Sequence, residues 1–308
     1  MTVTRILVSL PGGELREALG EASEGVEFIE WKMQDSAPVN SIDIVVPPYM
    51  GGTNLLFQLS NVRTRLVQSQ SVGYDGVEKV LPVGHVYANA TSVHEASTAE
   101  LALTLILAAQ RGIPEFVRAA EKGKWEPSQH PSLADRNVLL VGYGGVGKAI
   151  EARLLPFETI VTRVARTARS DERGRIYGID SLAELLPLAD IVVIGVPLSD
   201  ATTHLVNDEF LTLMVDGSLL VNVARGLVAD TDALLAHARS GRLRFALDVT
   251  DPEPLPDGHP LFSLPNVLIS PHVGGATSAM MPRMARLLHE QINRMMRGDD
   301  PVNVVVRS

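Results

Sequence analysis

Short runs of aliphatic and β-branched residues alternate with helical stretches along the first third of the chain. Turn residues at 11–13 and 51–52 separate some of these runs. The runs lie at residues 6–10, 26–31, 42–46, 66–69 and 86–88. Strands that alternate with helices predict a parallel sheet that is covered by helices on both faces.

A second alternation of the same kind begins after the stretch around Trp125. Its strands start at Val138, Ile160, Ile191, Leu219, Phe245 and Val267, with helical patterns between most of them. Between the two alternations, two successive capping boxes at 92–95 and 97–100 precede an apolar run that ends near 111–114. We therefore expect an α/β protein with two doubly wound parallel-sheet domains and a helix that bridges them.

Composition narrows the classes of function. The chain has 308 residues, 45% of them hydrophobic, which suits two globular domains. A formal charge of -9 disfavours binding to nucleic acids. The chain has no cysteine, which excludes disulfides and thiolate metal sites, so redox chemistry requires a cofactor. Residues 1–8 resemble a strand rather than a signal peptide, and the apolar run at 101–109 is about half a membrane span. We expect a cytoplasmic protein without membrane partner or metal.

A glycine-rich turn follows the strand that starts at Val138. It reads Gly142-Tyr143-Gly144-Gly145-Val146-Gly147, and a helix-compatible segment comes next. In a dinucleotide-binding turn Gly142 allows the tight bend, Gly144 admits the pyrophosphate and Gly147 lets the helix pack on the strand. A nucleoside triphosphate loop is the first alternative, but Ala149 occupies the position where that loop needs a hydroxyl. A purely structural turn is the second alternative.

The segment after the next strand predicts which cofactor is used. NAD-binding proteins carry an acidic residue there to bind the ribose, whereas residues 161–169 contain no carboxylate. Arg166 beside Thr167 can hold a 2′-phosphate, because a guanidinium matches the oxygens of a phosphate. We therefore expect NADP(H) to be favoured over NAD(H). Two alternatives stay open: the arginines form a solvated basic face, or Asp171 or Glu172 folds back onto the ribose.

Three residues that suit acid–base chemistry each follow a predicted strand: Arg225, Glu253 and His272. Ligands bind such sheets at the carboxyl ends of the strands. Hydride transfer to a ketone leaves negative charge on its oxygen, so the site needs a fixed cation and a proton donor. Arg225 can supply the cation, and His272 can exchange the proton, with Glu253 favouring the charged imidazole. The alternative is that each is an ordinary loop residue.

From about Ser69 onward the chain resembles the D-isomer-specific 2-hydroxyacid dehydrogenase family, which includes glyoxylate/hydroxypyruvate reductases. The resembling stretches are residues 142–147, 196–202, 220–226, 247–255 and 270–277. The resemblance implies a Rossmann dinucleotide-binding domain at 96–275. It implies a flavodoxin-like substrate domain at 1–95, completed by a C-terminal helix at 276–308. It also implies hydride transfer between NAD(P)H and a small 2-keto acid or D-2-hydroxy acid, and a homodimer.

The resemblance also implies roles for single residues. Arg225 would hold the keto acid, while Glu253 and His272 would form the proton-donating pair. Backbone N–H groups of Val72 and Gly73 would join Arg225 and His272 in binding the substrate. The cofactor would be bound by Gly142, Gly144, Gly145, Val146, Gly147, Arg166, Thr167, Val196, Pro197, Thr202, Val223, Ala224, Asp248 and Gly274.

Two other functions fit the same resemblance. A nucleotide-sensing, corepressor-like binding protein would use the same fold, although the intact arginine, glutamate and histidine argue against it. A phosphite dehydrogenase would retain the glutamate–histidine pair. The first sixty residues resemble the family only in pattern, so the resemblance assigns no substrate contact there, and Tyr49 and Met50 are candidates.

Three further side-chain patterns have simpler explanations. Met281, Met284, Leu288, Ile292 and Met295 form one stripe of the predicted last helix, at about 277–297, and we interpret them as core. His94 and His289 each precede a glutamate but lack the second histidine of a zinc protease motif. We expect these two histidines to be helix caps or surface residues.

Overall fold

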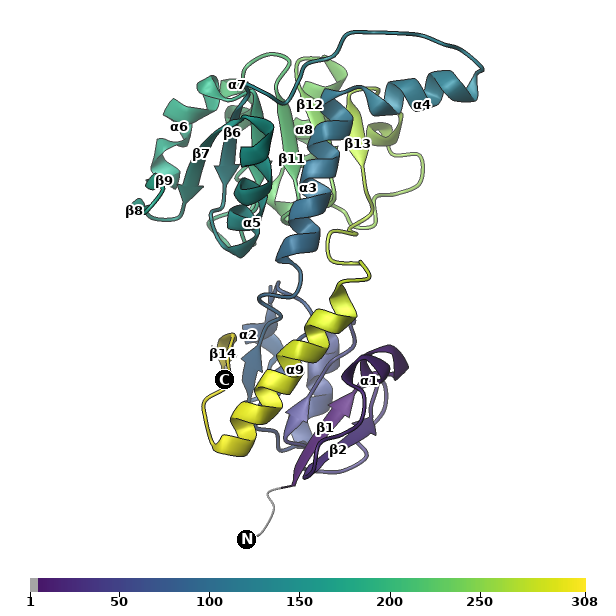
Figure 1. Ribbon diagram of the computed structural model, residues 1–308, viewed down its shortest axis with the longest axis vertical. Coiled ribbons are helices and arrows are strands. Elements are labelled where there is room, and N and C mark those ends of the chain that lie inside the picture. The colour runs from purple at the N-terminus through teal and green to yellow at the C-terminus, as the bar shows by residue number, and fades with distance from the viewer. Residues whose placement is uncertain (1–4) are drawn as a thin grey trace. The chain divides into compact units, whose positions relative to one another are not determined.

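The computed structural model describes residues 5–308, so the first four residues of the strand pattern predicted at 1–8 lie outside the described part. The chain forms two compact units, coloured from purple to yellow along the sequence in Figure 1. The first unit comprises Met1–His94 and Thr277–Ser308, and the second comprises Glu95–Ala276. Over the described residues the strands form one six-stranded and one eight-stranded sheet, one in each unit.

The six-stranded sheet of the first unit has the order β14-β5-β4-β3-β1-β2. Its strands are β1 (Ile6–Leu10), β2 (Val26–Glu30), β3 (Ile44–Val45), β4 (Leu66–Gln68), β5 (Val86–Ala88) and β14 (Val304–Arg307). Its helices are α1 (Gly13–Leu19), the 3-10 helix η1 (Thr53–Asn61), α2 (Val77–Val80) and α9 (Met280–Arg297). All neighbouring strands are parallel except β14, which pairs antiparallel with β5. The predicted parallel sheet is confirmed, and β14 is an addition that the sequence reading missed.

Separate apolar clusters cover the two faces of this sheet. One cluster joins residues of β1 and β3 to α1 and α9, and the other joins the sheet to η1 and α2. The methionine stripe of α9 belongs to the first cluster, with Met284 and Leu288 fully buried, so its interpretation as core is confirmed. The expectation that His94 is a surface residue was wrong, and the alternative that it caps a helix stays a prediction, since it directly precedes the helix at Glu95–Gln110. Its ring is buried, stacks on Tyr49 and bonds through Nε2 to the carbonyl oxygen of Gln70.

The eight-stranded sheet of the second unit has the order β13-β12-β11-β10-β6-β7-β9-β8. Its strands are β6 (Asn137–Val141), β7 (Ile160–Ala165), β8 (Arg169–Asp171), β9 (Gly174–Gly178), β10 (Ile191–Ile194), β11 (Leu219–Asn222), β12 (Arg244–Leu247) and β13 (Val267–Ile269). Only β8 runs antiparallel to its neighbour, β9. The run from β9 to β12 follows the strand order of a doubly wound nucleotide-binding fold. All six predicted strands are present, and β8 and β9 form an additional hairpin.

Helices of the second unit follow the strands in sequence. They are α3 (Glu95–Gln110), α4 (Ile113–Glu121), α5 (Gly145–Leu154), α6 (Leu182–Leu185), α7 (Asp208–Leu213) and α8 (Thr231–Arg239), with 3-10 turns η2 (Leu155–Phe157), η3 (Ile179–Ser181), η4 (Leu186–Leu188), η5 (Gly226–Val228) and η6 (Pro260–Ser263). Two of these helices start at capping side chains: Asn207 accepts a hydrogen bond from the N–H of Phe210, and Asp230 accepts from those of Asp232 and Ala233. Each cap satisfies N–H groups that the first helical turn leaves unpaired.

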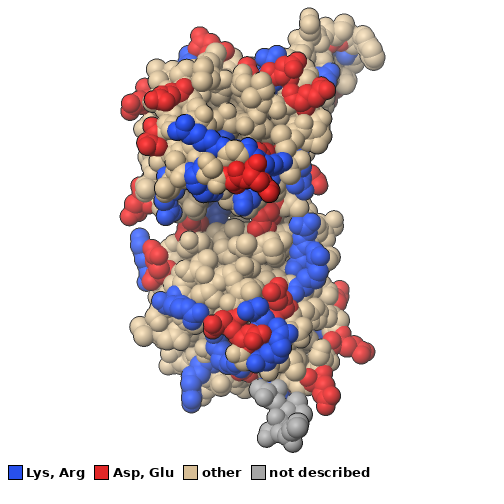
Figure 2. All heavy atoms as spheres, turned by 60° about the vertical axis from the view of Figure 1, so that its left-hand side comes forward, with Lys and Arg blue, Asp and Glu red and all other residues tan. Residues whose placement is uncertain are grey.

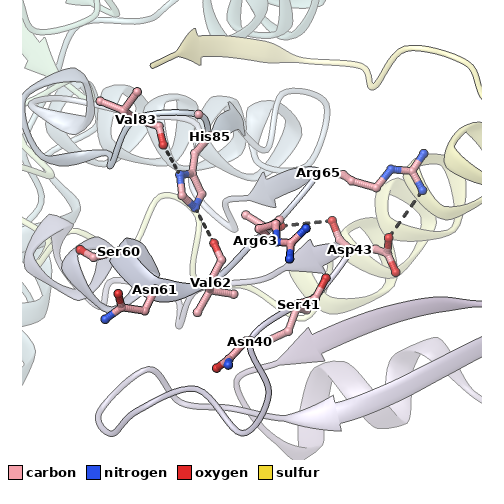
Figure 3. A pocket seen from close by; sticks show the side chains of 13 residues that line it. Asn40, Ser41, Asp43, Ser60, Asn61, Val62, Arg63, Arg65, Val83 and His85 are labelled. Atoms are coloured by element: carbon pink, nitrogen blue, oxygen red, sulfur yellow. Dashed lines mark hydrogen bonds and ion pairs between the residues drawn. The ribbon is translucent and has the colours of Figure 1, made fainter.

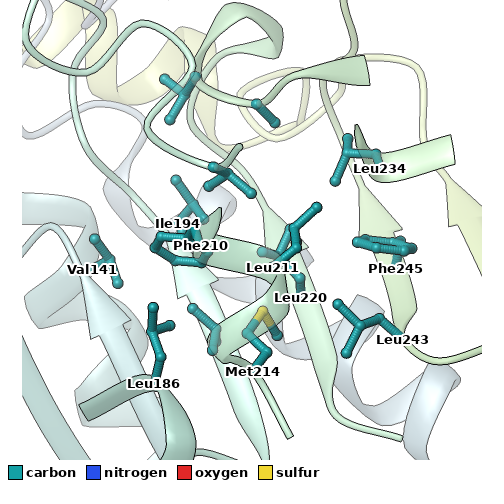
Figure 4. Packing of buried hydrophobic residues seen from close by; sticks show 14 of the residues in the cluster. Val141, Leu186, Ile194, Phe210, Leu211, Met214, Leu220, Leu234, Leu243 and Phe245 are labelled. Atoms are coloured by element: carbon teal, nitrogen blue, oxygen red, sulfur yellow. The ribbon is translucent and has the colours of Figure 1, made fainter. Parts of the chain in front are cut away.

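The core of the second unit explains why its strands are so uniformly apolar. Val141, Ile194, Leu220 and Phe245 come from four strands and pack with Phe210 of α7 and other apolar side chains, as Figure 4 shows. Strands that are buried on both faces carry near-continuous aliphatic runs. This packing fixes the carboxyl ends of the strands, where the candidate site residues lie. None of the helices within residues 5–308 combines the length and apolar character needed to cross a membrane.

Candidate functional site

The glycine turn between β6 and α5 has the geometry that a dinucleotide phosphate requires. Gly142 has φ of +110°, and a Cβ atom on it would lie 2.5 Å from the carbonyl carbon of Gly195. A Cβ on Gly147 would lie 2.2 Å from the carbonyl oxygen of Gly142. At Gly144, by contrast, a Cβ would meet no heavy atom within 4 Å. Two glycines are thus required by close packing, while the third leaves open space at the start of α5, where a phosphate fits. Gly145 faces the side chain of Glu95 instead.

A buried ionic network lies beneath this turn. Arg163 of β7 and Glu151 of α5 are each 4% exposed, and the Arg163 Nε atom lies 3.7 Å from Glu151 Oε1. Tyr143 donates its hydroxyl to Glu151, and Arg173 Nη1 lies 2.6 Å from the same carboxylate. Arg163 Nη1 also donates to Asp171 Oδ1 at 3.0 Å. The network ties the turn, α5 and the β8–β9 hairpin together, because each contributes a member.

The pKa of Asp171 reflects its place in this network. Partial desolvation acts to raise it, but hydrogen bonds from the backbone of Arg173 and from the Arg163 guanidinium outweigh that effect, so the pKa is lowered. The carboxylate of Asp171 is therefore paired with Arg163. It is not the unpaired acid that a ribose contact at this position would use.

The two residues predicted to select the cofactor lie in the bend between β7 and β8. Arg166 and Thr167 are both exposed there. Over residues 5–308 no carboxylate pairs with the Arg166 guanidinium. Arg169, three residues further on, donates from Nη2 to the carbonyl oxygen of Tyr143 at 3.0 Å. The arrangement leaves Arg166 available to an anionic ligand, as the prediction of a 2′-phosphate contact requires.

The turn after β10 contains the next predicted cofactor residues. Val196 is buried, and the Thr202 hydroxyl donates to the carbonyl oxygen of Pro197 at 2.7 Å. The same hydroxyl oxygen accepts the N–H of Ser199 at 2.8 Å, which closes the turn. The structure thus gives Thr202 a clear local role in shaping this loop.

The loop that bears Arg225 is set by Asn222 at the end of β11. The Asn222 side chain accepts the N–H of Ala224 and donates to the carbonyl oxygen of Arg225, both at 3.0 Å. Val223 and Ala224 are buried. Sequence reasoning did not identify Asn222 as a positioning residue, although an asparagine at a strand end is a typical turn former.

Gly226 brings the Arg225 loop against the next loop of the site. A Cβ atom on Gly226 would lie 1.8 Å from the carbonyl oxygen of Thr250, so only glycine permits this approach. Thr250 follows β12 and precedes Glu253 by three residues. The loops carrying Arg225 and Glu253 are therefore in direct backbone contact.

The turn that bears His272 is built around the carboxylate of Asp248. Oδ1 of Asp248 accepts hydrogen bonds from the Ser270 hydroxyl at 2.7 Å and the Val273 N–H at 2.9 Å, and Oδ2 accepts the Gly274 N–H at 3.0 Å. The N–H of His272 donates to the carbonyl oxygen of Asp248 at 2.7 Å. His272 has φ of +52°, a left-handed conformation that these bonds hold in place. Asp248 itself is 3% exposed. Its predicted cofactor contact stays a prediction.

The imidazole of His272 is paired with the carboxylate of Glu253. Nδ1 of His272 is hydrogen-bonded to Oε1 of Glu253, and the two side chains are 26% and 38% exposed. A carboxylate at Nδ1 fixes the ring orientation and directs Nε2 away from the pair. Both residues thus remain accessible to a ligand while their mutual geometry is defined.

Two residues predicted to bind the substrate lie in the first unit. Val72 and Gly73 belong to the loop between β4 and α2, after the carboxyl end of β4. Asn89 holds this loop by donating to the carbonyl oxygen of Val72 at 2.8 Å. In the described chain no hydrogen bond uses the backbone N–H of Val72 or Gly73. Tyr49 stacks on His94, whereas Met50 is 56% exposed.

A hollow of about 740 Å³ lies elsewhere in the first unit, at the amino ends of β3, β4 and β5. Figure 3 shows its side chains, among them Arg65 paired with Asp43 at 3.6 Å. The ring of His85 lies between the carbonyl oxygens of Pro82 and Val62. Because parallel strands bind ligands at their carboxyl ends, this hollow is not the candidate active site.

Comparisons with known proteins agree with this arrangement. Residues 103–274 match the model of the D-isomer specific 2-hydroxyacid dehydrogenase, NAD binding domain. The chain is 36% identical to a glyoxylate reductase of Thermococcus onnurineus over 259 residues, which cover 80% of this chain and 77% of the relative. It is 34% identical to a glyoxylate reductase of Pyrococcus furiosus over 258 residues, 79% of this chain and 76% of that one. The chain is also similar to a crystal structure of a D-isomer specific 2-hydroxyacid dehydrogenase from Xanthobacter autotrophicus in complex with NADPH and MES. The TM-score is 0.82 and the sequence identity is 28%, over 98% of both chains.

Proposed function

Since the chain belongs to the D-isomer-specific 2-hydroxyacid dehydrogenase family, whose members are NAD(P)-dependent oxidoreductases, we propose that it reduces a small 2-keto acid such as glyoxylate or hydroxypyruvate, with NADPH as the preferred cofactor. One observation carries the proposal: His272, paired with Glu253, lies on a turn fixed by Asp248, at the same sheet edge as the glycine turn. Relatives named glyoxylate reductase support the choice of substrate.

The proposed mechanism assigns one task to each side chain. Bound NADPH supplies the hydride that the carbonyl carbon of the substrate accepts. Arg225 binds the substrate carboxylate and stabilises the negative charge that develops on the carbonyl oxygen. His272 donates a proton from Nε2 to that oxygen, and Glu253 orients the ring through Nδ1 and favours its protonated form. In the oxidation direction the same imidazole accepts the proton.

The first unit supplies the remaining substrate contacts in this proposal. Backbone N–H groups of Val72 and Gly73 would bind the substrate carboxylate, since the structure gives them no other acceptor over residues 5–308. In this reading the first unit is the substrate domain and the second is the dinucleotide-binding domain, with a boundary at Glu95.

The preference for NADPH rests on Arg166. Its guanidinium is exposed and has no carboxylate partner among residues 5–308, and the nearby Asp171 is paired with Arg163. A 2′-phosphate therefore finds a cation at this position, and the carboxylate of Asp171 is already engaged by Arg163. The similar Xanthobacter autotrophicus structure was determined with NADPH, which is consistent with this choice.

We also propose that two copies of the chain associate through α4 and the loop after it. Ile113 and Val117 of α4 are 48% and 52% exposed, and Trp125 in the following loop is 94% exposed. Exposed aromatic and aliphatic side chains grouped in this way are typical of protein interfaces.

On the face shown in Figure 2, acidic and basic side chains are interspersed, so that face lacks the continuous basic surface a nucleic acid would need. A cytoplasmic location stays a prediction.

Turnover of purified protein tests the main proposal. The protein is mixed with NADPH or NADH and a panel of 2-keto acids, and nicotinamide absorbance is followed. We expect faster consumption of NADPH than NADH, with glyoxylate or hydroxypyruvate among the best substrates. No consumption with any acid, together with tight NADPH binding, would overturn the proposal in favour of a nucleotide sensor. A parallel reaction with phosphite and NAD(P)⁺ tests the phosphite dehydrogenase alternative.

A further inference from the structure

A second, smaller hollow lies in the dinucleotide-binding unit, at the edge of the sheet opposite the candidate active site. Its volume is about 180 Å³. Its lining includes Arg136 before β6, Asp190 before β10, Ser218 before β11 and Arg244 at the start of β12. All four strands are parallel, so these residues meet at the amino ends of the strands. The candidate catalytic residues follow the carboxyl ends.

Two guanidinium groups bring positive charge to this hollow. Burial is the largest cause of a lowered pKa at Arg244, and the positive charge of Arg136 lowers it further, while Glu115 acts in the opposite direction. Both arginines line the same hollow, so the two cations lie near each other. An anion between them would relieve this repulsion.

The acidic side chains that line the hollow already have partners. Asp190 accepts the N–H of Asn137 at 2.8 Å and pairs with Arg136 at 3.4 Å. Asp216 pairs with Arg242 at 2.8 Å, and its side chain is 81% exposed. Neither carboxylate neutralises Arg244.

Both arginines keep unused N–H donors. Arg244 donates to the carbonyl oxygens of Gly217 and Ala109 and to Oε1 of Gln110, which occupies three of the five guanidinium N–H groups. With the described residues, the Arg136 guanidinium makes only two long hydrogen bonds, of 3.3 and 3.4 Å. Donors therefore exceed acceptors around the hollow.

Ser218 provides an independent sign of a missing ligand. The residue is 4% exposed, and its buried hydroxyl has no hydrogen-bond partner in the described part of the chain. A buried hydroxyl without a partner is unfavourable, and most native structures avoid it. A bound acceptor in the hollow would satisfy this hydroxyl.

We propose that this hollow binds a small oxyanion of the phosphate type, held by Arg136, Arg244 and Ser218. An oxyanion offers acceptors to both guanidinium groups and to the hydroxyl at once. The volume suits a group of this size. Pockets for drug-sized ligands begin at about 300 Å³, so the hollow is too small for a dinucleotide. The site is separate from the cofactor turn and does not depend on the proposed function.

Calorimetric titration with inorganic phosphate tests the proposal. The titration is run at constant ionic strength with chloride as the balancing ion, and with saturating NADPH so that the cofactor's own phosphate contacts are occupied. We expect one saturable binding event in the wild type. Arg136→Gln should weaken it about tenfold or more, because a charge-assisted hydrogen bond is lost. Ser218→Ala should weaken it several-fold, on the order of one neutral hydrogen bond.

The control is Arg286→Gln, which makes the same charge change on the exposed face of α9 in the other unit. Its phosphate affinity should equal that of the wild type. Thermal melting without phosphate verifies that each variant is folded, and Ser218→Ala removes only an unpaired hydroxyl and should melt normally. The proposal is wrong if the wild type shows no saturable event, or if all four proteins bind phosphate equally.

Discussion

Replacing Asp248 with asparagine preserves the size of the side chain but removes its charge and turns one acceptor into a donor. In the wild type this buried carboxylate accepts hydrogen bonds from Ser270, Val273 and Gly274 at 2.7, 2.9 and 3.0 Å. The amide nitrogen of asparagine would face the N–H of Gly274. Water cannot replace the lost acceptor readily, because the residue is only 3% exposed. The variant should therefore loosen the turn that carries His272.

The magnitude follows from these three bonds. Leaving one buried N–H unsatisfied costs about 1–3 kcal/mol, and the other two bonds each weaken by roughly 1 kcal/mol when the acceptor becomes neutral. The loss of unfolding free energy should be about 3–5 kcal/mol. For a unit of this size that corresponds to a decrease in Tm of roughly 6–20 °C. A misplaced imidazole should also lower turnover, by about 10²-fold for a displacement near 1 Å.

Differential scanning calorimetry of the cofactor-free protein measures the first effect, and steady-state reduction of a 2-keto acid measures the second. Ser270→Ala is the matched control, because it removes one of the three donors and leaves the carboxylate intact. It should lower the free energy of unfolding by about 1 kcal/mol, and Tm correspondingly less than Asp248→Asn does. If Asp248→Asn melts within about 2 °C of the wild type while turnover falls, the carboxylate acts directly on a ligand and the positioning argument is refuted.

Three further predictions follow from the cofactor half of the site. Arg166→Ala should weaken NADPH binding about tenfold or more and leave NADH binding nearly unchanged; equal effects in fluorescence titrations would remove the 2′-phosphate contact. Gly147→Ala should lower Tm because its Cβ would meet a backbone oxygen at 2.2 Å. Gly144→Ala, whose Cβ would meet no atom, should melt normally and lose NADPH affinity. A normal melt for both variants would contradict the close-packing argument. The lowered pKa of Asp171 means that its contribution to stability is present above about pH 4 and is lost as pH falls further. Asp171→Asn should therefore melt with a smaller difference in Tm between pH 7 and pH 3 than the wild type, and an unchanged difference would show that the pairing with Arg163 adds no stability.

The strands that sequence predicts well are those buried on both faces. The run 138–141 is continuously aliphatic because apolar clusters cover it from either side, so its pattern reveals it directly. The β8–β9 hairpin was missed because its exposed residues are mainly polar, and Arg163 holds it from inside the sheet. β14 was missed although 304–306 is apolar, because its partner β5 lies more than two hundred residues earlier in the chain. Periodicity does not report such distant pairing.

At the site, the side chains that suit acid–base chemistry could be predicted from the sequence, whereas the hydrogen bonds that position them could not. The family resemblance implied that Glu253 and His272 form a pair, and the structure shows their side chains in contact. The acceptor role of Asp248 and the turn-forming role of Asn222 were not foreseen, because each depends on backbone N–H groups of a folded loop. The burial of His94 was missed for a similar reason, since its carbonyl partner comes from another strand–loop segment.

Single-turnover reduction of glyoxylate or hydroxypyruvate by NADPH, compared between wild type and His272→Asn, tests the proposed proton donor most directly. Asparagine removes the titrating imidazole, and NADPH affinity should stay within a factor of about two because the variant leaves the glycine turn intact. The rate of NADPH oxidation should fall by about 10²- to 10⁴-fold. A variant that binds NADPH normally and oxidises it within about threefold of the wild-type rate would contradict the assignment of His272 as the acid.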